Sequence, residues 1–155
     1  MKIPEWIRES NLIEGVDASI EDRRSYMAWI WFKKQPLTLK TILKLHQKIM
    51  WVHLDSRRDQ RGKWRTVNVR VGGRICSDWS EVKYLMIEWI VRHDLINMKE
   101  IEIQWAHIAF QKIHPFIDGN GRTGRMIMNW QRVHFGLKPL CIKASERQDY
   151  YEWFK

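Results

Sequence analysis

The chain has 155 residues, 45% of them hydrophobic, which suits one domain with a sizeable core. Lysine and arginine outnumber aspartate and glutamate by 27 to 18, so the net charge of +9 predicts an anionic partner, with nucleic acid as the first class to consider. An aromatic content of 12% excludes a disordered chain. Without a long apolar run or a zinc-like spacing of Cys76 and Cys141, we expect a cytoplasmic protein with reduced cysteines and no membrane span.

Hydrophobic periodicity predicts a mainly helical chain. Helices are predicted, in chain order, over residues 9–14, 19–33, 39–50, 82–90, 101–113 and 122–135. Met50, Met86, Met126 and the tryptophan side chains are interpreted as packing residues. The only alternating stretch, Val67 to Val71, runs into Gly72 and Gly73 and predicts a short strand or hairpin. The pattern therefore indicates a helical bundle with a small basic β-hairpin.

The excess positive charge is concentrated in two segments. Residues 57–74 carry seven basic side chains against Asp59, and residues 112–132 carry four against Asp118. The net charges of these two segments, +6 and +3, add up to the whole net charge of the chain. Two solvated basic faces would explain this distribution, and so would a single anionic ligand held from two sides.

Residues 114–125 read HPFIDGNGRTGR and contain groups typical of phosphate binding. Pro115 disfavours a helical conformation at His114, so the preceding helix is expected to end there. The stretch from Gly119 to Gly121 can adopt positive φ and turn successive N–H groups into a concavity ahead of a helix, where phosphate binds. Arg122 and Arg125, three residues apart, are expected to reach further phosphate oxygens.

Asp118 and His114 complete this chemistry. A lone carboxylate beside phosphates would repel them, so Asp118 indicates a Mg²⁺ ion, which binds one or two carboxylates together with substrate phosphates. A histidine, with an ordinary pKa of about 6.5, can accept a proton from a hydroxyl near neutral pH. The segment therefore predicts transfer of a phosphorus-centred group to a hydroxyl. The other histidines are interpreted as structural: His46, His53, His93, His107 and His134.

The same segment fills every position of the pattern His-x-Phe-x-Asp/Glu-Gly-Asn-Gly-Arg-x-x-Arg, and the chain resembles the Fic family. PLTLKTILKLHQKIM resembles the first core helix of the family, GKWRTVNVRVGG its flap, and ASERQDYYEWF the segment that closes over the nucleotide. The resemblance implies an all-α Fic-type helical bundle with a short β-hairpin flap. It also implies an N-terminal segment over residues 1–35 and a Fic core over 36–155, with the flap at about 63–75.

The resemblance further implies a protein adenylyltransferase that moves AMP from ATP to a Ser, Thr or Tyr hydroxyl of a target protein. His114 would deprotonate that hydroxyl, and Asp118 would hold Mg²⁺ at the α- and β-phosphates. The ATP phosphates would be bound by Gly119, Asn120, Gly121, Arg122, Thr123, Gly124 and Arg125, with Asn120 at the α-phosphate, Arg122 on the β-phosphate side and Arg125 at the γ-phosphate. The flap would hold the target by strand addition, Val71, Gly72, Gly73 and Arg74 would border the nucleotide, and Tyr150 and Tyr151 would form the adenosine-side wall.

An upstream segment, Ser10-Asn11-Leu12-Ile13-Glu14-Gly15, fits the inhibitory pattern Ser/Thr-x-x-x-Glu-Gly/Asn of Fic proteins. The resemblance implies that Glu14 forms a bidentate pair with Arg125 and takes the guanidinium that the γ-phosphate needs. ATP would then bind with its α-phosphate out of line for attack. We expect an enzyme that is largely off at rest.

Two alternatives stay open at this point. A Fic-type enzyme can remove AMP from a target, with Glu14 acting on water, or transfer another nucleotidyl or phosphoryl group. A basic nucleic-acid-binding module is a different class, favoured by the charge of residues 57–74 but without a helix-turn-helix or zinc pattern. Self-modification and a homo-oligomer are both compatible with the sequence.

Overall fold

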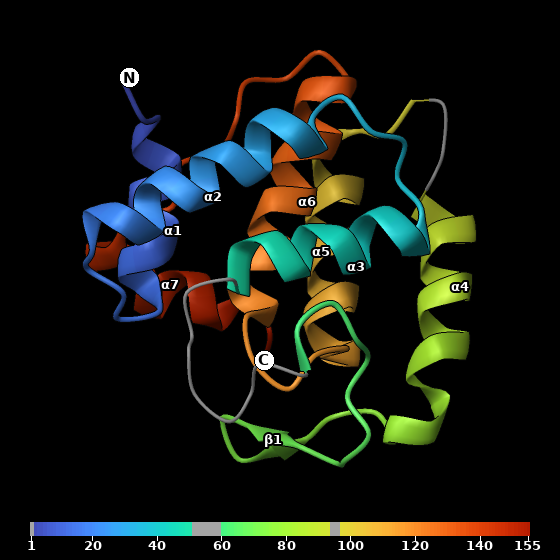
Figure 1. Cartoon of the computed structure of the whole chain (residues 1–155). Helices are drawn as coiled ribbons and strands as arrows, with labels where there is room; N and C mark the ends of the chain where they lie inside the picture. The colour runs from blue at the N-terminus through green and yellow to red at the C-terminus, as the bar shows by residue number, and fades with distance from the viewer. Residues whose placement is uncertain (1, 51–59, 94–96) are drawn as a thin grey trace.

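The computed structural model describes residues 2–50, 60–93 and 97–155 and shows a helical bundle (Figure 1). Its helices are α1 (Glu5–Ile13), α2 (Ser19–Phe32), α3 (Leu39–Ile49), α4 (Val82–His93), α5 (Glu100–Ile113), α6 (Asn120–His134) and α7 (Arg147–Glu152). Two 3₁₀ turns, η3 (Trp79–Glu81) and η4 (Ala144–Glu146), precede α4 and α7. The strands β1 (Arg70–Val71) and β2 (Arg74–Ile75) form a two-stranded sheet. The prediction of an all-α bundle with a short hairpin is confirmed.

The helix boundaries follow the local signals with two exceptions. Thr38 caps α3 as the sequence suggests, because its hydroxyl accepts the Thr41 N–H at 3.2 Å. Helix α1 begins at Glu5 rather than at residue 9, with Pro4 at its N-cap. Helix α6 begins at Asn120, two residues before the predicted start, because Gly119 already takes the N-cap position.

The hairpin is shorter than the alternating valines predict. Arg70 pairs with Ile75 and Val71 with Arg74, and Gly72 and Gly73 close the turn at φ values of 55° and 80°. Beyond these pairs the Cys76 N–H still donates to the Val69 carbonyl at 3.1 Å, and the Asn68 side chain bonds to the segment after β2. Its amide donates to the Asp78 carboxylate at 3.1 Å and accepts the Trp79 N–H at 2.8 Å.

A single hydrophobic core surrounds α6, which lies in the middle of the bundle (Figure 1). Phe32 of α2 packs on Trp130 of α6 with ring centroids 6.1 Å apart, so the segment 1–35 shares this core. The predicted packing methionines Met50, Met86 and Met126 are buried. The same prediction is wrong for Trp79 and Trp105, which are 45% and 59% exposed.

The cysteines and the helix lengths agree with the sequence. Cys76 is buried, Cys141 is partly buried, and both are free. Among the described residues, no helix combines the length and apolar character needed to cross a membrane.

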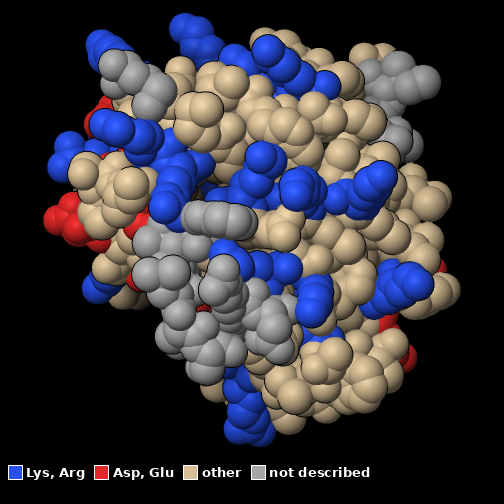
Figure 2. Space-filling view, in the orientation of Figure 1, with Lys and Arg blue, Asp and Glu red and all other residues tan. Residues whose placement is uncertain are grey.

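A third basic face emerges from the packing of α2 against α3. Residues 19–50 carry seven lysine and arginine side chains against Glu21 and Asp22. Lysine and arginine side chains lie over the face that α2 and α3 present in Figure 2. The charge count along the sequence does not reveal this face. Outside the two basic segments, acidic residues elsewhere in the chain cancel the positive charge of residues 19–50.

Candidate active site

The catalytic loop begins where α5 ends. Helix α5 stops at Ile113, and His114 forms its C-cap with φ 51° and ψ 62°, in the left-handed region. The prediction that Pro115 ends the helix here is confirmed. Burial lowers the pKa of His114, and the nearby Arg65 guanidinium adds to this effect. A hydrogen bond to the Gln111 backbone and the charges of Glu14 and Asp118 act to raise this pKa. The imidazole is therefore neutral at pH 7 and able to accept a proton.

The loop between His114 and α6 is held closed by Asn120. Its side-chain oxygen accepts the Phe116 N–H at 2.9 Å, and its amide nitrogen donates to the Phe116 carbonyl at 2.8 Å. Gly119 adopts φ 76°, as the sequence predicts, whereas Asn120 and Gly121 already belong to α6. The structure thus places the Asn120 side chain on the loop itself, and its contact with a phosphate stays a prediction.

Thr123 and Gly124 are both packed inside the bundle, and Gly124 lies in the contact between α6 and α5. Thr123 is fully buried. A Cβ atom on Gly124 would lie 2.4 Å from Gln111 Nε2 and 3.0 Å from Phe110 Cδ1. Their predicted contact with phosphates also stays a prediction, because the structure shows both residues packed inside the bundle.

Arg122 and Asp118 stand on either side of the start of α6. The Asp118 carboxylate accepts the Gly119 N–H at 2.7 Å. Arg122 is buried, and its Nη2 lies 3.2 Å from the Met50 sulfur. Burial lowers the pKa of Arg122, while Asp118 and Glu14 act to raise it. The loop therefore gathers a carboxylate and a buried guanidinium around one helix N-terminus.

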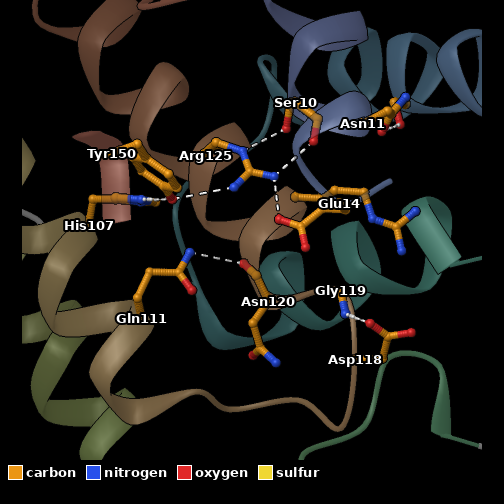
Figure 3. A network of polar contacts seen from close by, with 12 residues as sticks. Ser10, Asn11, Glu14, His107, Gln111, Asp118, Gly119, Asn120, Arg125 and Tyr150 are labelled. Carbon is orange, nitrogen blue, oxygen red and sulfur yellow. Dashed lines mark hydrogen bonds and ion pairs between the residues drawn. The ribbon is translucent and has the colours of Figure 1, made fainter. Parts of the chain in front are cut away.

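Arg125 is the centre of a polar network that joins α1, α6 and α7 (Figure 3). Its Nε donates to Ser10 Oγ at 2.9 Å, and its Nη2 donates both to the Ser10 carbonyl at 2.8 Å and to Glu14 Oε1 at 2.7 Å. The predicted pairing of Glu14 with Arg125 is therefore present. Its predicted bidentate form is wrong, because Ser10 and Tyr150 take the remaining guanidinium edges.

Tyr150 belongs to this network, and its role with Tyr151 as the adenosine-side wall stays a prediction. It is buried, and its hydroxyl accepts from Arg125 Nη1 at 3.3 Å and bonds His107 Nε2 at 2.8 Å. Tyr151 beside it is 40% exposed. No spacing in the sequence links Tyr150 with Arg125, so only the docking of α7 reveals this contact.

The Glu14 carboxylate lies directly against the first turn of α6. A Cβ atom built on Gly121 would stand 2.1 Å from Glu14 Oε1, so only a glycine at this position allows so close an approach. The N-terminus of a helix carries partial positive charge and favours anions. The carboxylate thus occupies the kind of position that the sequence predicts for a phosphate.

Side-chain bonds fix α1 in this position. The Asn11 side-chain Nδ2 donates to the Asp22 carboxylate of α2 at 2.8 Å, and the Ser25 hydroxyl donates to Asn11 Oδ1 at 3.2 Å. On the other side, Glu9 accepts the Ala144 N–H at 2.8 Å. The segment from Ser10 to Gly15, which is predicted to be inhibitory, therefore begins in a helix that is packed into the structure.

His46 supports the loop from α3. Its Nδ1 accepts the Gly62 N–H at 2.9 Å, so its Nε2 carries the proton and donates to the Asp118 carbonyl at 2.9 Å. Its ring stacks on Phe116 with centroids 3.7 Å apart. Burial lowers the pKa of His46 to about 4, which keeps it neutral. The sequence predicts a structural role for His46, and this prediction is confirmed. No signal in the sequence indicates its hydrogen bond to the Asp118 carbonyl.

The flap residues are exposed beside the C-terminal segment. Val71, Gly72, Gly73 and Arg74 are all exposed. Arg74 Nη1 donates to the Phe154 carbonyl at 3.1 Å, which ties the hairpin to the residues after α7. Some of the basic side chains that could face one anionic ligand do not test this expectation or have another partner. Arg57 and Arg58 lie outside the described residues. Arg132 forms an ion pair with Glu100 at 2.5 Å.

Asp118 is the residue suited to a metal. Within the described ranges, no group of three His, Cys, Asp or Glu side chains could hold an ion. A single carboxylate is nevertheless an acceptable protein ligand for Mg²⁺, which takes its other ligands from water and phosphates. The donor set therefore fits Mg²⁺ brought in with a nucleotide, and not a permanent protein-only metal centre.

Comparisons with known proteins agree with this geometry. The model of the Fic/DOC family matches residues 36–131. The chain is 32% identical to "Protein adenylyltransferase Fic" of Drosophila grimshawi and 33% identical to that of Drosophila erecta, each over 96% of this chain and 30% of the relative. It thus spans about a third of the length of these relatives.

Solved structures share the fold at low sequence identity. A Fic domain containing signaling protein from Bacteroides thetaiotaomicron superposes with a TM-score of 0.75 at 21% identity, over 96% of this chain and 68% of that one. Fic-1 from C. elegans gives a TM-score of 0.75 at 20% identity, over 95% and 52% of the two chains. At these identities the superpositions speak for the architecture alone.

Proposed function

Because the chain belongs to the Fic/DOC family, we propose that it is a protein adenylyltransferase whose activity is held down by its own α1. The observation that carries this proposal is the Glu14 carboxylate, seated against Gly121 and bound to Arg125. A carboxylate in that position occupies an anion site made by the loop and the start of α6. The names of the Drosophila relatives support adenylyl transfer as the reaction at this site.

The reaction assigned to this site moves AMP from ATP to a target hydroxyl. The hydroxyl oxygen attacks the α-phosphorus and forms the new phosphoester bond, while the bond to the bridging oxygen breaks and pyrophosphate leaves. His114 takes the proton of the hydroxyl, since its neutral imidazole is available at pH 7. Gly119 and the first turn of α6 would present N–H groups to the phosphates.

Asp118 is the residue that would hold Mg²⁺ in this enzyme. The ion would supply positive charge to the phosphates of ATP. Arg122 and Arg125 would add guanidinium groups at the same helix end. Both side chains are almost completely buried while α1 is in place.

Inhibition in this proposal comes from competition for Arg125. In the described structure its guanidinium donates to Ser10, Glu14 and Tyr150, which leaves it engaged within the protein. An ATP γ-phosphate would need these donors and the space now taken by Glu14. Withdrawal of α1 would release both, which is why we expect activity to rise when Glu14 is removed.

The target protein would bind along the flap. The two-stranded sheet leaves outer strand edges for an added strand. Its surface carries the aliphatic side chains of Val71 and Ile75 beside Arg70, all exposed. This composition favours an extended target segment with aliphatic and acidic side chains.

Transfer of labelled AMP tests the proposal. Glu14→Ala, incubated with α-phosphate-labelled ATP and Mg²⁺, should label itself or lysate proteins at least tenfold more than the wild-type chain. Asp17→Ala is the matched control, because Asp17 is an exposed acidic side chain three residues after Glu14 and lies outside α1. Glu14→Ala combined with His114→Ala should lose the label.

Each outcome has a distinct meaning. Equal labelling by the wild-type chain and Glu14→Ala would contradict inhibition by α1. Labelling that survives His114→Ala would contradict the assigned base. Absence of label in every variant, with salt-sensitive DNA binding instead, would favour the nucleic-acid-binding alternative.

A further inference from the structure

Arg65 is a buried cation that contacts the catalytic loop. It lies between the predicted strand and α3 in the sequence, and its exposed fraction is 1%. Its Nε donates to the His114 carbonyl at 2.8 Å, and its Nη2 donates to the Ile113 carbonyl at 3.2 Å. Its backbone N–H donates to the Pro115 carbonyl at 2.9 Å. Three consecutive peptide groups around the proposed base therefore accept from one residue.

The same guanidinium also holds the base of the flap. Its Nη1 donates to the Val67 carbonyl at 2.8 Å, and its Nη2 donates to the Ser77 carbonyl. These two carbonyls lie just before β1 and just after β2. Arg65 therefore bridges both ends of the hairpin and the end of α5.

These bonds control the direction of the His114 side chain. The peptide group that ends in the Ile113 carbonyl precedes the His114 Cα atom, and the one with the His114 carbonyl follows it. Fixing both peptide planes fixes φ and ψ of His114 and hence the direction of its Cα–Cβ bond. The left-handed φ of 51° is unfavourable for a non-glycine residue by about 1–2 kcal/mol, so outside contacts must maintain it.

The burial of Arg65 has a cost that packing alone does not explain. Burial lowers the pKa of its guanidinium, while Cys76 and Asp78 act to raise it. Its hydrogen-bond partners among the described residues are backbone carbonyls, which give direction without neutralising the charge. An aliphatic side chain would fill the same volume without the free-energy cost of burying a charge, but it could not orient four carbonyls.

We infer that Arg65 is a positioning residue that sets the flap edge and the His114 imidazole in a fixed relation to each other. A hydroxyl on a segment bound to the flap would then lie within reach of the base. This inference rests on the proposed function for its consequence in catalysis. The hydrogen-bond geometry on which it stands does not depend on the identity of the transferred group.

Activity measurements in the Glu14→Ala background give the first test. Arg65→Met should lower kcat for target labelling at least tenfold, because the base and the flap no longer share one support. Arg65→Lys should also lower kcat, since a single ammonium group cannot donate to all four carbonyls. The Kd for MgATP should change less than twofold in both variants, because Arg65 contacts none of the residues proposed to bind phosphate.

An NMR titration of His114 gives a second test that needs no activity. The charged groups that act on His114 are Arg65, Glu14 and Asp118. Arg65→Met removes a neighbouring positive charge and loosens the burial of the ring. The pKa of His114 should therefore rise toward 6.5 in Arg65→Met in the otherwise wild-type chain.

Arg132 provides the matched control. It is another almost completely buried arginine, and its Nε donates to the Lys138 carbonyl at 2.8 Å near the C-terminal end of α6. Arg132→Met should lower Tm but leave kcat and the His114 titration as they are. If Arg65→Met does not fold, Arg65→Lys is compared with Arg132→Lys by the same measurements.

The two tests separate this inference from the proposed function. If Arg65 variants lower Tm like the Arg132 variants but leave the His114 titration and kcat unchanged, the positioning role is overturned. If Glu14→Ala itself transfers no AMP, the proposed function fails. In that case a raised His114 pKa in Arg65→Met still supports the positioning role, and an unchanged one overturns it.

Discussion

The Glu14 carboxylate and the Arg125 guanidinium, 111 positions apart in the chain, lie 2.7 Å from each other. Arg125 also donates to the Ser10 carbonyl, which lies in the last turn of α1. The negative end of α1 thus faces a cation near the positive end of α6. Release of the inhibitory segment would require breaking these contacts together.

Ser10 should share the inhibitory role with Glu14. Its hydroxyl accepts from Arg125 Nε at 2.9 Å, and Ser10→Ala leaves this buried donor without that partner. A hydrogen bond to a charged group contributes about 1.5–3 kcal/mol. We expect Ser10→Ala to raise AMP labelling to a level between those of the wild-type chain and Glu14→Ala.

Ser80→Ala, on the exposed turn η3, is the control for loss of a serine hydroxyl and should label like the wild-type chain. Labelling by Ser10→Ala no higher than that of Ser80→Ala would show that Ser10 does not contribute.

Asp118 should decide the metal dependence of nucleotide binding. In the Glu14→Ala background, ATP with Mg²⁺ should raise Tm more than ATP with EDTA, as measured by differential scanning fluorimetry. Asp118→Ala should abolish this difference, because it removes the proposed carboxylate ligand. Asp149→Ala on the exposed side of α7 should preserve it. A Mg²⁺-dependent shift that survives Asp118→Ala would assign the ion to other ligands.

Gly124 should be required for the close contact of α5 and α6. An added methyl group would displace Gln111 from the Asn120 carbonyl, to which it now donates at 3.2 Å, and would press on Phe110. Overpacking of this kind costs about 1–3 kcal/mol. Urea unfolding of Gly124→Ala should show a loss in that range.

Gln111→Ala makes room for the added methyl group. The double variant should therefore lose less stability than the sum of the two single variants. Strict additivity of the two losses would contradict the contact.

His107 should make stability depend on pH. Burial, aided by Arg125, lowers its pKa from 6.5 to about 3 in the folded chain. Between these values the unfolded chain binds more protons, so the free energy of unfolding decreases as the pH falls below 6.5. The contribution is about 1.4 kcal/mol per pH unit in this window, or about 2 kcal/mol between pH 7 and pH 5.

Urea unfolding at pH 7 and pH 5 measures this effect. From pH 7 to pH 5, the free energy of unfolding should decrease by about 2 kcal/mol less in His107→Gln than in the wild-type chain. Gln104→Ala, which changes a side chain of α5 that does not titrate, should retain the wild-type pH dependence. Equal losses for all three chains would show that His107 does not titrate in this window.

The local features of the site were predictable from the sequence because they depend on neighbouring residues. Pro115 ends α5 by its steric effect on the residue before it, and Gly119 supplies the positive φ at the start of α6. Helix stripes and the cap at Thr38 follow from short-range periodicity and a local hydrogen bond. The pairing of Glu14 with Arg125 came from a motif pattern, and the structure confirms the contact but not its bidentate form.

Contacts between distant segments were decided by tertiary packing alone. Tyr150 reaches Arg125 only because α7 docks beside α6, and Arg65 finds its carbonyls only where the flap meets the end of α5. The basic face of α2 and α3 likewise arises from packing two helices side by side. The sequence by itself determined which groups are available and which turns they occupy. Packing of the whole chain decided which groups meet, because hydrogen bonds reach only about 3 Å and every such contact depends on the relative placement of complete helices.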